Sequence, residues 1–192
     1  MEENKAQKKI KLLLRLERSL PKVLYPGTDM EVIEWTLPNG LVHRDYGPAQ
    51  EYVDGVQIWY QNGVTHREGG PAEIYGDNEI YCLFGCSVSK DDFAAQVELI
   101  KSARKNGDKV FKIKTETERI VYFNRQLQCH REDGPAMIYV NGNELWIQKN
   151  KRHREDGPAE IFKDSKIENY WIRGKQLTMI EFEQWKQKNK RK

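Results

Sequence analysis

The sequence predicts a β-rich α+β protein built from two tandem-duplicated lobes of antiparallel β-hairpins. Each lobe is expected to end in a closing helix, and a further helix is expected at the N-terminus. A seven-residue signature, His-Arg-x-x-Gly-Pro-Ala, occurs four times in the 192 residues. Its copies form two pairs with an internal spacing of 23 residues, and a shift of 87 residues superimposes one pair on the other. Repetition at a fixed spacing is typical of repeat architectures.

The duplication extends beyond the signature. Aligning residues 35–78 with residues 122–165 gives 19 identities in 44 positions, including Trp59 with Trp146. So long a match indicates that the two halves share one fold. We therefore divide the chain into an N-terminal helix and linker at 1–30, a first lobe at 31–111 and a second lobe at 112–192.

Short strand-like segments alternate with turn residues inside each lobe. In the first lobe, Ala49–Val53 and Val56–Tyr60 flank Asp54-Gly55, and Asn62-Gly63 follows. Asp-Gly and Asn-Gly between such segments are typical of type I′ hairpin turns, because both central residues need a positive φ. The second lobe repeats the pattern with Met137–Val140, Asn141-Gly142 and Asn143–Ile147.

The signature itself has the chemistry of a turn. Glycine tolerates conformations that other residues avoid, proline suits the first position of a strand, and alanine allows close backbone approach. His-Arg and the following acidic residue can form a hydrogen-bonded network that pins the loop. We therefore expect a fold-supporting role for His43, Arg44, Gly47, Pro48, His66, Arg67, Gly70, Pro71, His130, Arg131, Gly134, Pro135, His153, Arg154, Gly157 and Pro158.

A closing helix is predicted near the end of each lobe, at Phe93–Arg104 and at Phe182–Lys188. Thr178 and Glu181 stand at the spacing of a capping box, which favours a helix start there. Each helix carries large apolar residues on one face. We expect both helices to cover the apolar face or the edge of their own sheet.

The two ends of the chain are basic and the middle is acidic. Residues 1–22 and 183–192 each carry a net charge of +4, which leaves −5 for residues 23–182 out of a total of +3. Basic ends can bind nucleic acid or an acidic partner. The candidate contacts are Lys8, Lys9, Lys11, Arg15, Lys188, Lys190, Arg191 and Lys192.

A third helix is predicted over residues 4–19, with an apolar stripe of leucines that extends to Leu20. Such a helix can pack on the first lobe, bind a partner, mediate a homodimer or lie on a membrane surface. The chain has no apolar run long enough to cross a membrane and no recognisable signal peptide, and its three cysteines form no disulfide framework. We therefore expect a cytoplasmic protein.

The repetition also bears on catalysis. An active site needs one converging set of groups, whereas four equivalent His-Arg clusters favour a structural role. His43-Arg44-Asp45 matches the kinase catalytic tripeptide, but the other kinase motifs are missing. The spacing of Cys82 and Cys86 is not that of a zinc finger, so buried thiols are expected. We predict no enzyme activity, no metal and no cofactor.

The repeated units, which combine Asn-Gly, HREDGPA, Asp/Asn-Gly and Trp, resemble short tandem repeats in bacteriophage and giant-virus proteins. Those repeats are distantly similar to MORN-type hairpin repeats. The resemblance covers residues 35–88 and 122–177, and Tyr46 and Gly69 depart from it in the aspartate position. It implies a structural or protein-interaction surface, and for a phage protein one that binds and redirects or inhibits a host protein. No catalytic residue carries over.

These observations favour a non-enzymatic protein–protein interaction module. Exposed residues that differ between the lobes are the candidate contacts, with segment 104–120 and strand 80–84 as examples. One alternative is a nucleic-acid-binding protein that uses its basic ends. A second alternative is a hydrolase or nuclease that uses one His-Arg-Glu cluster, and a self-assembling structural protein is a further possibility.

Overall fold

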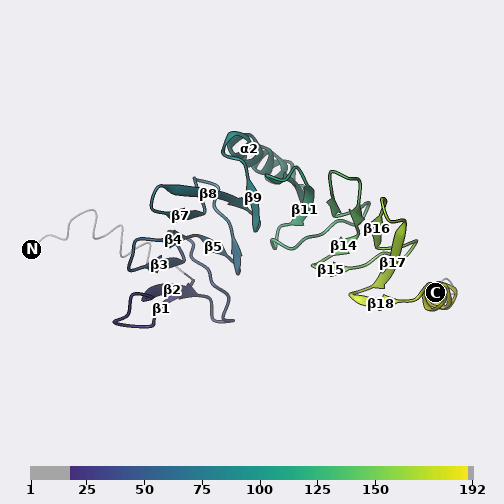
Figure 1. Ribbon diagram of the computed structural model, residues 1–192, viewed down its shortest axis with the longest axis horizontal. Coiled ribbons are helices and arrows are strands. Elements are labelled where there is room, and N and C mark those ends of the chain that lie inside the picture. The colour runs from purple at the N-terminus through teal and green to yellow at the C-terminus, as the bar shows by residue number, and fades with distance from the viewer. Residues whose placement is uncertain (1–17, 190–192) are drawn as a thin grey trace, which may run out of the picture. The chain divides into compact units, whose positions relative to one another are not determined.

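The computed structural model describes residues 18–189, and in this part of the chain it shows two seven-stranded antiparallel sheets (Figure 1). The two sheets have the same strand order. The order in the first sheet is β1 (Leu20–Leu24), β2 (Val32–Thr36), β3 (Gln50–Tyr52), β4 (Gln57–Ile58), β7 (Glu73–Tyr75), β8 (Asn78–Leu83) and β9 (Cys86–Val88).

The second sheet repeats this order strand by strand. It runs β10 (Val110–Lys114), β11 (Ile120–Asn124), β12 (Met137–Ile138), β13 (Glu144–Leu145), β16 (Glu160–Phe162), β17 (Ile167–Ile172) and β18 (Lys175–Leu177). The predicted fold class, a β-rich protein of two duplicated lobes, is therefore confirmed.

One hairpin in each lobe bends sharply at a tryptophan. The predicted strand Val56–Tyr60 is divided at Trp59 into β4 and β5 (Tyr60–Gln61), and β5 pairs with β6 (Val64–Thr65) in a separate small sheet. Trp59 donates its backbone N–H to the carbonyl of Ala72 at 2.7 Å and accepts from the N–H of His66 at 3.1 Å. In the second lobe, Trp146 divides β13 from β14 (Ile147–Gln148), which pairs with β15 (Lys151–Arg152).

The predicted type I′ turn is confirmed at Asn62-Gly63, where φ is 52° and 80°. The same prediction is wrong at Asp54-Gly55, because only the glycine has a positive φ. Gly55 donates its N–H to the carbonyl of Tyr52, and Asp54 Oδ1 accepts from the N–H of Val56. This is the pattern of a type I turn followed by a glycine bulge.

Asn141-Gly142 departs from the prediction in the same way. Gly142 has a φ of 80°, whereas the φ of Asn141 is not positive. The Asn141 side chain accepts a hydrogen bond from the backbone N–H of Asn143 at 3.2 Å. A side-chain acceptor at this position stabilises a type I turn, so two-residue spacing alone did not identify the turn type.

Both predicted helices form, and each is longer than expected. The C-terminal helix, α3 (Met179–Asn189), starts with the predicted capping box, in which Glu181 accepts from the N–H of Thr178 at 2.7 Å and Thr178 Oγ1 accepts from the N–H of Glu181 at 3.2 Å. The Phe182 ring lies 4.8 Å from the ring of Tyr170. The helix therefore packs on β17 of its own sheet, as expected.

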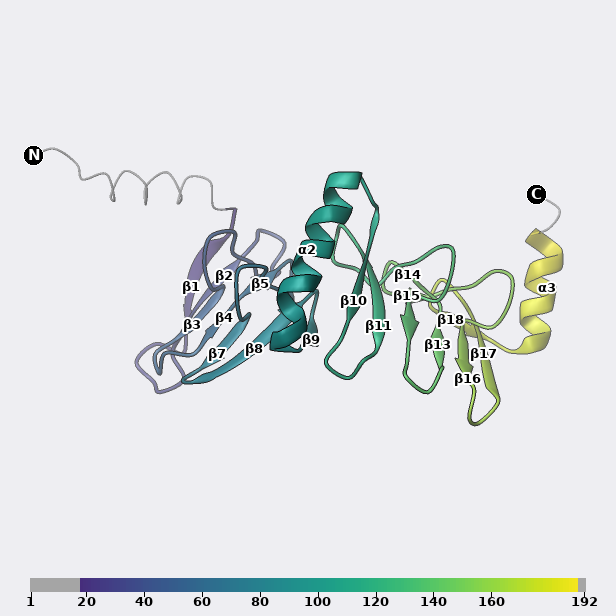
Figure 2. The same cartoon turned by 90° about the horizontal axis from the view of Figure 1, so that it is seen from above.

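Helix α2 (Lys90–Asn106) lies beside β10 (Figure 2). The buried amide of Gln96 donates to the carbonyl of Lys114 at 2.7 Å and accepts from its N–H at 2.8 Å. Because β10 is the first strand of its sheet, this side chain bonds to a backbone edge that would otherwise be unpaired. The two compact units of the chain divide between Lys90 and Asp91, so α2 groups with the second lobe. The predicted boundary after residue 111 had placed this helix in the first lobe.

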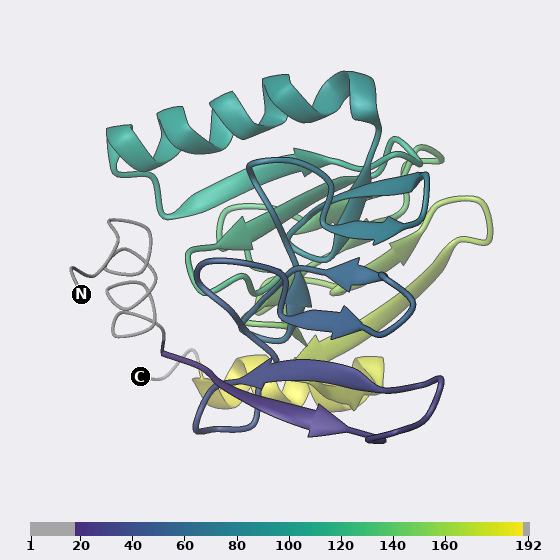
Figure 3. The ribbon, with the colours of Figure 1, turned by 90° about the vertical axis from the view of Figure 1, so that its left-hand side faces the viewer.

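The predicted N-terminal helix lies outside the described residues, except for Arg18 and Ser19. Leu20, which we assigned to its apolar stripe, is instead in β1 and is 71% exposed. Pro21 disfavours a helical conformation at Leu20, and proline is tolerated in an edge strand. The first sheet therefore starts at residue 20 and not at 31, and Figure 3 shows β1 and β2 in purple as its outer hairpin.

Candidate functional site

Each signature histidine is buried and fixes the turn of the following hairpin. Its Nδ1 atom accepts a hydrogen bond from the backbone N–H of the first residue of a two-residue turn, in which both residues have a positive φ. The second turn residue donates to the carbonyl of the residue before the histidine, as Gly63 does to Val42 at 2.8 Å. The nitrogen–nitrogen distances are 3.0, 3.1, 3.2 and 3.2 Å for Asn62–His43, Phe84–His66, Lys149–His130 and Arg173–His153.

The other ring nitrogen faces the carboxylate two residues further along the chain. Because Nδ1 accepts a hydrogen bond, we assign the proton of the neutral imidazole to Nε2. Both nitrogens of His43 and His66 are therefore hydrogen-bonded within the protein, whereas Nε2 of His130 and of His153 faces an exposed carboxylate at a longer distance. The Nε2–oxygen distances are 3.1, 3.2, 3.5 and 3.4 Å for His43–Asp45, His66–Glu68, His130–Glu132 and His153–Glu155.

Each signature arginine lies flat against an aromatic ring of its own lobe. The guanidinium carbon is 3.8–4.3 Å from the ring centroid, which is a close cation–π distance, and Nη1 donates to the carbonyl of the signature proline. The arginine therefore ties the signature loop to the strand segment that carries the aromatic residue. The pairs are Arg44–Trp35, Arg67–Trp59, Arg131–Tyr122 and Arg154–Trp146.

The arginine also explains the signature glycine. We expected glycine for its turn conformation, but the φ of Gly47, Gly134 and Gly157 is not positive, so this reason is wrong at those positions. A Cβ atom built on them would lie 3.0, 2.7 and 3.3 Å from the guanidinium carbon of the same signature. Glycine is needed because the guanidinium occupies that space. The signature alanine is likewise fully buried in all four copies.

The aspartate position distinguishes the two lobes. Asp133 and Asp156 accept from Nε of the signature arginine at 2.9 and 2.8 Å, and these hydrogen bonds lower the pKa of both carboxyl groups. In the first lobe the position holds Tyr46 and Gly69, which cannot make this bond. The turn-pinning aspartate is therefore a feature of the second lobe alone.

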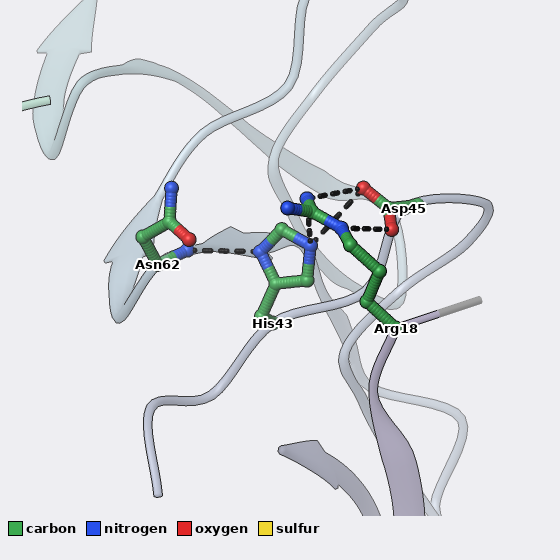
Figure 4. A network of polar contacts seen from close by, with 4 residues as sticks. All are labelled: Arg18, His43, Asp45 and Asn62. Atoms are coloured by element: carbon green, nitrogen blue, oxygen red, sulfur yellow. Dashed lines mark hydrogen bonds and ion pairs between the residues drawn. The ribbon is translucent and has the colours of Figure 1, made fainter. Parts of the chain in front are cut away.

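Arg18 completes the first signature of the chain (Figure 4). Its guanidinium donates to both Asp45 oxygens, at 2.9 and 3.0 Å, and lies 3.1 Å from His43 Nε2. The hydrogen bond from Arg18 is the main cause of the lowered pKa of Asp45, with His43 contributing. The backbone N–H of Asn62 donates to Nδ1 on the other side of the imidazole. A series of polar contacts therefore joins the start of the lobe to the Asn62-Gly63 turn; it runs through Arg18, Asp45, His43 and Asn62.

The cysteine and metal predictions concern residues that are all described. Cys82 and Cys86 are buried, and burial raises the pKa of the Cys82 thiol to about 11. Cys82 Sγ lies 3.8 Å from a carboxylate oxygen of Glu73. Within residues 18–189 no group of three His, Cys, Asp or Glu side chains is arranged to hold a metal ion.

The predicted basic contacts lie almost entirely outside the described residues. Only Lys188 is described, as an exposed residue in the last turn of α3. The two segments predicted as partner contacts contain both buried and exposed residues. Phe111 and Ile113 of segment 104–120, and residues 82–84 of the predicted strand 80–84, are buried and so present no surface to a partner.

The two lobes differ most on one face of their sheets. In the first lobe, strand register places Glu34, Gln50, Ile58 and Glu73 in one row across four strands. Tyr52 and Tyr75 stand two residues along from Gln50 and Glu73 in the same strands, and therefore on the same side of the sheet. Tyr60 follows the division at Trp59, and it lies close enough to this row for Glu73, Tyr52 and Glu34 to raise its pKa. We call this surface the tyrosine face and define it by Glu34, Gln50, Tyr52, Tyr60, Glu73 and Tyr75.

Hydrogen bonds connect neighbours on the tyrosine face. Gln50 donates to Glu34 at 2.6 Å, and Tyr75 donates to Glu73 at 2.8 Å. The bond to Glu73 raises the pKa of Tyr75 to about 12, while burial and the nearby Glu73 charge raise the pKa of Tyr60. Tyr60 and Tyr75 therefore stay protonated beside these carboxylates. Neither Glu34 nor Glu73 forms an ion pair with any described residue.

The equivalent face of the second lobe contains its own arginines. Glu160, equivalent to Glu73, is 5% exposed and forms an ion pair with Arg152, whose guanidinium also lies 5.1 Å from the Trp171 ring. Arg119 lies 5.6 Å from the ring of Tyr139. In the first lobe, the positions of Arg152 and Arg119 hold Thr65 and Val32.

Strand alternation and the offset of 87 residues contained the signal that would have identified the tyrosine face. The offset pairs Thr65 with Arg152 and Val32 with Arg119, whereas the segments predicted as contacts, 104–120 and 80–84, do not include these positions. Neither helix within residues 18–189 is long and apolar enough to cross a membrane. No protein-family model, curated protein or solved structure matches this chain.

Proposed function

We propose that the chain is a non-enzymatic module that binds another protein. One observation carries this proposal: the side chains of the signature are engaged within the fold, whereas equivalent sheet faces on the same frame carry different residues. A repeat frame that keeps its framework residues and varies its surface is suited to binding. The resemblance to phage and giant-virus repeats favours a host protein as the partner, which the chain would redirect or inhibit.

The engaged histidines weaken the hydrolase alternative. A general base or nucleophile-activating histidine needs a ring nitrogen within reach of substrate. Each His here uses Nδ1 to accept a backbone N–H and turns Nε2 toward a carboxylate, as His66 does with Phe84 and Glu68. Substrate could reach the ring only by displacing one of these partners.

Affinity capture with the tagged full chain, from a lysate of cells that carry it, tests the proposal. The capture is run with and without nuclease, and bound proteins are identified by mass spectrometry. We expect a protein that is retained in stoichiometric amount after nuclease treatment and that binds again when purified. Retention of nucleic acid, with all proteins lost after nuclease, would instead assign the function to the basic ends.

A further inference from the structure

The second lobe shows what the tyrosine face of the first lobe can bind. Its carboxylate at Glu160 accepts hydrogen bonds from Asn169 and from the Trp171 indole, both at 3.1 Å, and pairs with the guanidinium of Arg152. Arginine is well suited to such a position because its planar group can pair with a carboxylate and lie on an aromatic ring together.

The equivalent carboxylate in the first lobe has a phenol donor in place of the amide and indole donors, and it has no guanidinium. Glu73 accepts from Tyr75, and its second oxygen lies 3.8 Å from Cys82 Sγ, which is a weak donor. Thr65 takes the position of Arg152, and its short side chain cannot supply a charge. A half-buried carboxylate is therefore surrounded by tyrosines without a cation.

A second carboxylate lies further along the same row. Glu34 is bonded to Gln50 and, among the described residues, to no cation. Lys22 is its cross-strand neighbour on β1 but makes no ion pair with it. Three strand spacings separate Glu34 from Glu73, or about 14 Å. An extended peptide covers about the same distance in four residues.

We propose that the tyrosine face binds an extended segment of a partner protein that carries arginines four residues apart, one at Glu73 and one at Glu34. The rings of Tyr60 and Tyr52 offer cation–π surfaces on which the guanidinium groups can lie. This inference rests on the proposed function, because it names the chemistry of the partner of a protein-binding module.

The first experiment is an NMR titration of the full-length ¹⁵N-labelled chain with the peptide Gly-Arg-Gly-Ser-Gly-Arg-Gly. We expect saturable shifts centred on the amides of β2, β3, β4 and β7, with a Kd of about 0.1–1 mM, as suits two exposed charge contacts. A peptide with adjacent arginines should bind more weakly. Absence of shifts, or shifts spread evenly over acidic residues of both lobes, would overturn the proposal.

The sharpest variant is Thr65→Arg, which gives the first lobe the arginine of the second. The new guanidinium should pair with Glu73 and occupy the site from within, so peptide binding should weaken about tenfold or more. Glu34→Gln with Glu73→Gln should have a similar effect. The matched control, Glu98→Gln with Glu116→Gln, removes the same charge from exposed positions of the second lobe and should leave the Kd unchanged. Equal weakening in both double variants would show diffuse attraction and contradict a specific site.

Thermal melting checks that each variant is folded, and Thr65→Arg should melt no lower than the parent because it adds an ion pair. One further variant examines the chain's own basic end as the occupant. This variant combines Lys8→Gln, Lys9→Gln, Lys11→Gln and Arg15→Gln. If the peptide bound to this variant and not to the parent chain, the N-terminal segment would be the occupant and not a partner protein.

The same variants separate this inference from the proposed function. A captured partner that is lost by Thr65→Arg and kept by the control supports both. A partner that binds both variants equally leaves the protein-binding function standing and removes the tyrosine face from it. Peptide binding at the face, together with capture of nucleic acid only, would overturn the proposed function and leave a guanidinium site without a protein partner.

Discussion

The two lobes share a frame and differ in how their carboxylates are satisfied. Both use histidines to fix the next turn and arginines on aromatic rings to hold the loop. The second lobe adds ion pairs from Asp133, Asp156 and Glu160 to its own arginines. The first lobe has Tyr46 and Gly69 at two of these positions and leaves Glu73 without a cation. Comparison of the two lobes therefore distinguishes the residues that the fold requires from the residues that can change.

The largest expected effect tests the shared part of the frame. His66→Ala removes a buried ring that lies 4.7 Å from Phe84, and it leaves the Phe84 N–H without an acceptor. We expect a loss of about 4 kcal/mol, and about 3 kcal/mol for His153→Ala, whose ring is less completely buried. Urea unfolding measures the loss in the free energy of unfolding for both variants, and hydrogen exchange measures the protection of the turn amides.

His66→Asn provides the control, because the asparagine Oδ1 atom can occupy the place of Nδ1 and accept the same N–H. It should recover part of the lost stability, while His66→Gln should recover less. If alanine cost no more than about 1 kcal/mol at both positions, the turn contacts would not hold the hairpins together.

The next effect tests what differs between the lobes. Arg152→Thr gives the second lobe the residue of the first and leaves the buried Glu160 unpaired. We expect a loss of about 2 kcal/mol, below the usual cost for a fully buried pair because Arg152 is 44% exposed. Adding Glu160→Gln should restore part of this loss. Denaturant melts of the single and double variants measure the coupling, and additive effects would mean that the pair is not an interacting unit.

Glycine substitutions should separate the signature glycine from the glycine that takes the aspartate position in one copy. Gly134→Ala places a Cβ atom 2.7 Å from the Arg131 guanidinium, which must leave its ring, and should cost about 1 kcal/mol. Gly69→Ala meets nothing within 4 Å and should be neutral. Gly69→Asp should raise the free energy of unfolding by about 0.5 kcal/mol, because it creates beside Arg67 the ion pair found in the second lobe. Thermal melts order the three, and a destabilising Gly69→Asp would contradict the assigned role of that position.

The smallest effect concerns acid. The pKa of Asp45 and of Asp156 is lowered in the folded state, so the stability that each contributes is present above the ordinary value near 3.8 and is lost as pH falls below it. Asp45→Asn and Asp156→Asn should each cost about 0.5 kcal/mol at pH 7, since both arginine partners are partly exposed. Chemical denaturation at pH 7 and pH 3 should show the parent and the variants converging in acid. An unchanged difference at pH 3 would show that the carboxylate charge is not the cause.

The repeat frame can be read from the sequence alone, because the spacing of 23 residues and the offset of 87 are visible in the chain. The sequence also predicted both helices, including the capping box at Thr178, but it assigned α2 to the first lobe, whereas α2 groups with the second. The turn at Asp54-Gly55 and the strand that starts at Leu20 were not predicted correctly. Both depend on local competition, in one case between a side-chain acceptor and a backbone turn and in the other between helix and strand pairing with β2.

Only the tertiary structure decided the partners of the signature residues. The acceptor role of His43 depends on a turn 19 residues away, and the need for Gly134 depends on where the Arg131 guanidinium lies. The same is true of the tyrosine face, where pairing of β2, β3, β4 and β7 brings Glu34 and Glu73 into one row. A sequence records which residues are repeated, whereas bond geometry and strand register determine which of them meet, because both arise from contacts between distant parts of the chain.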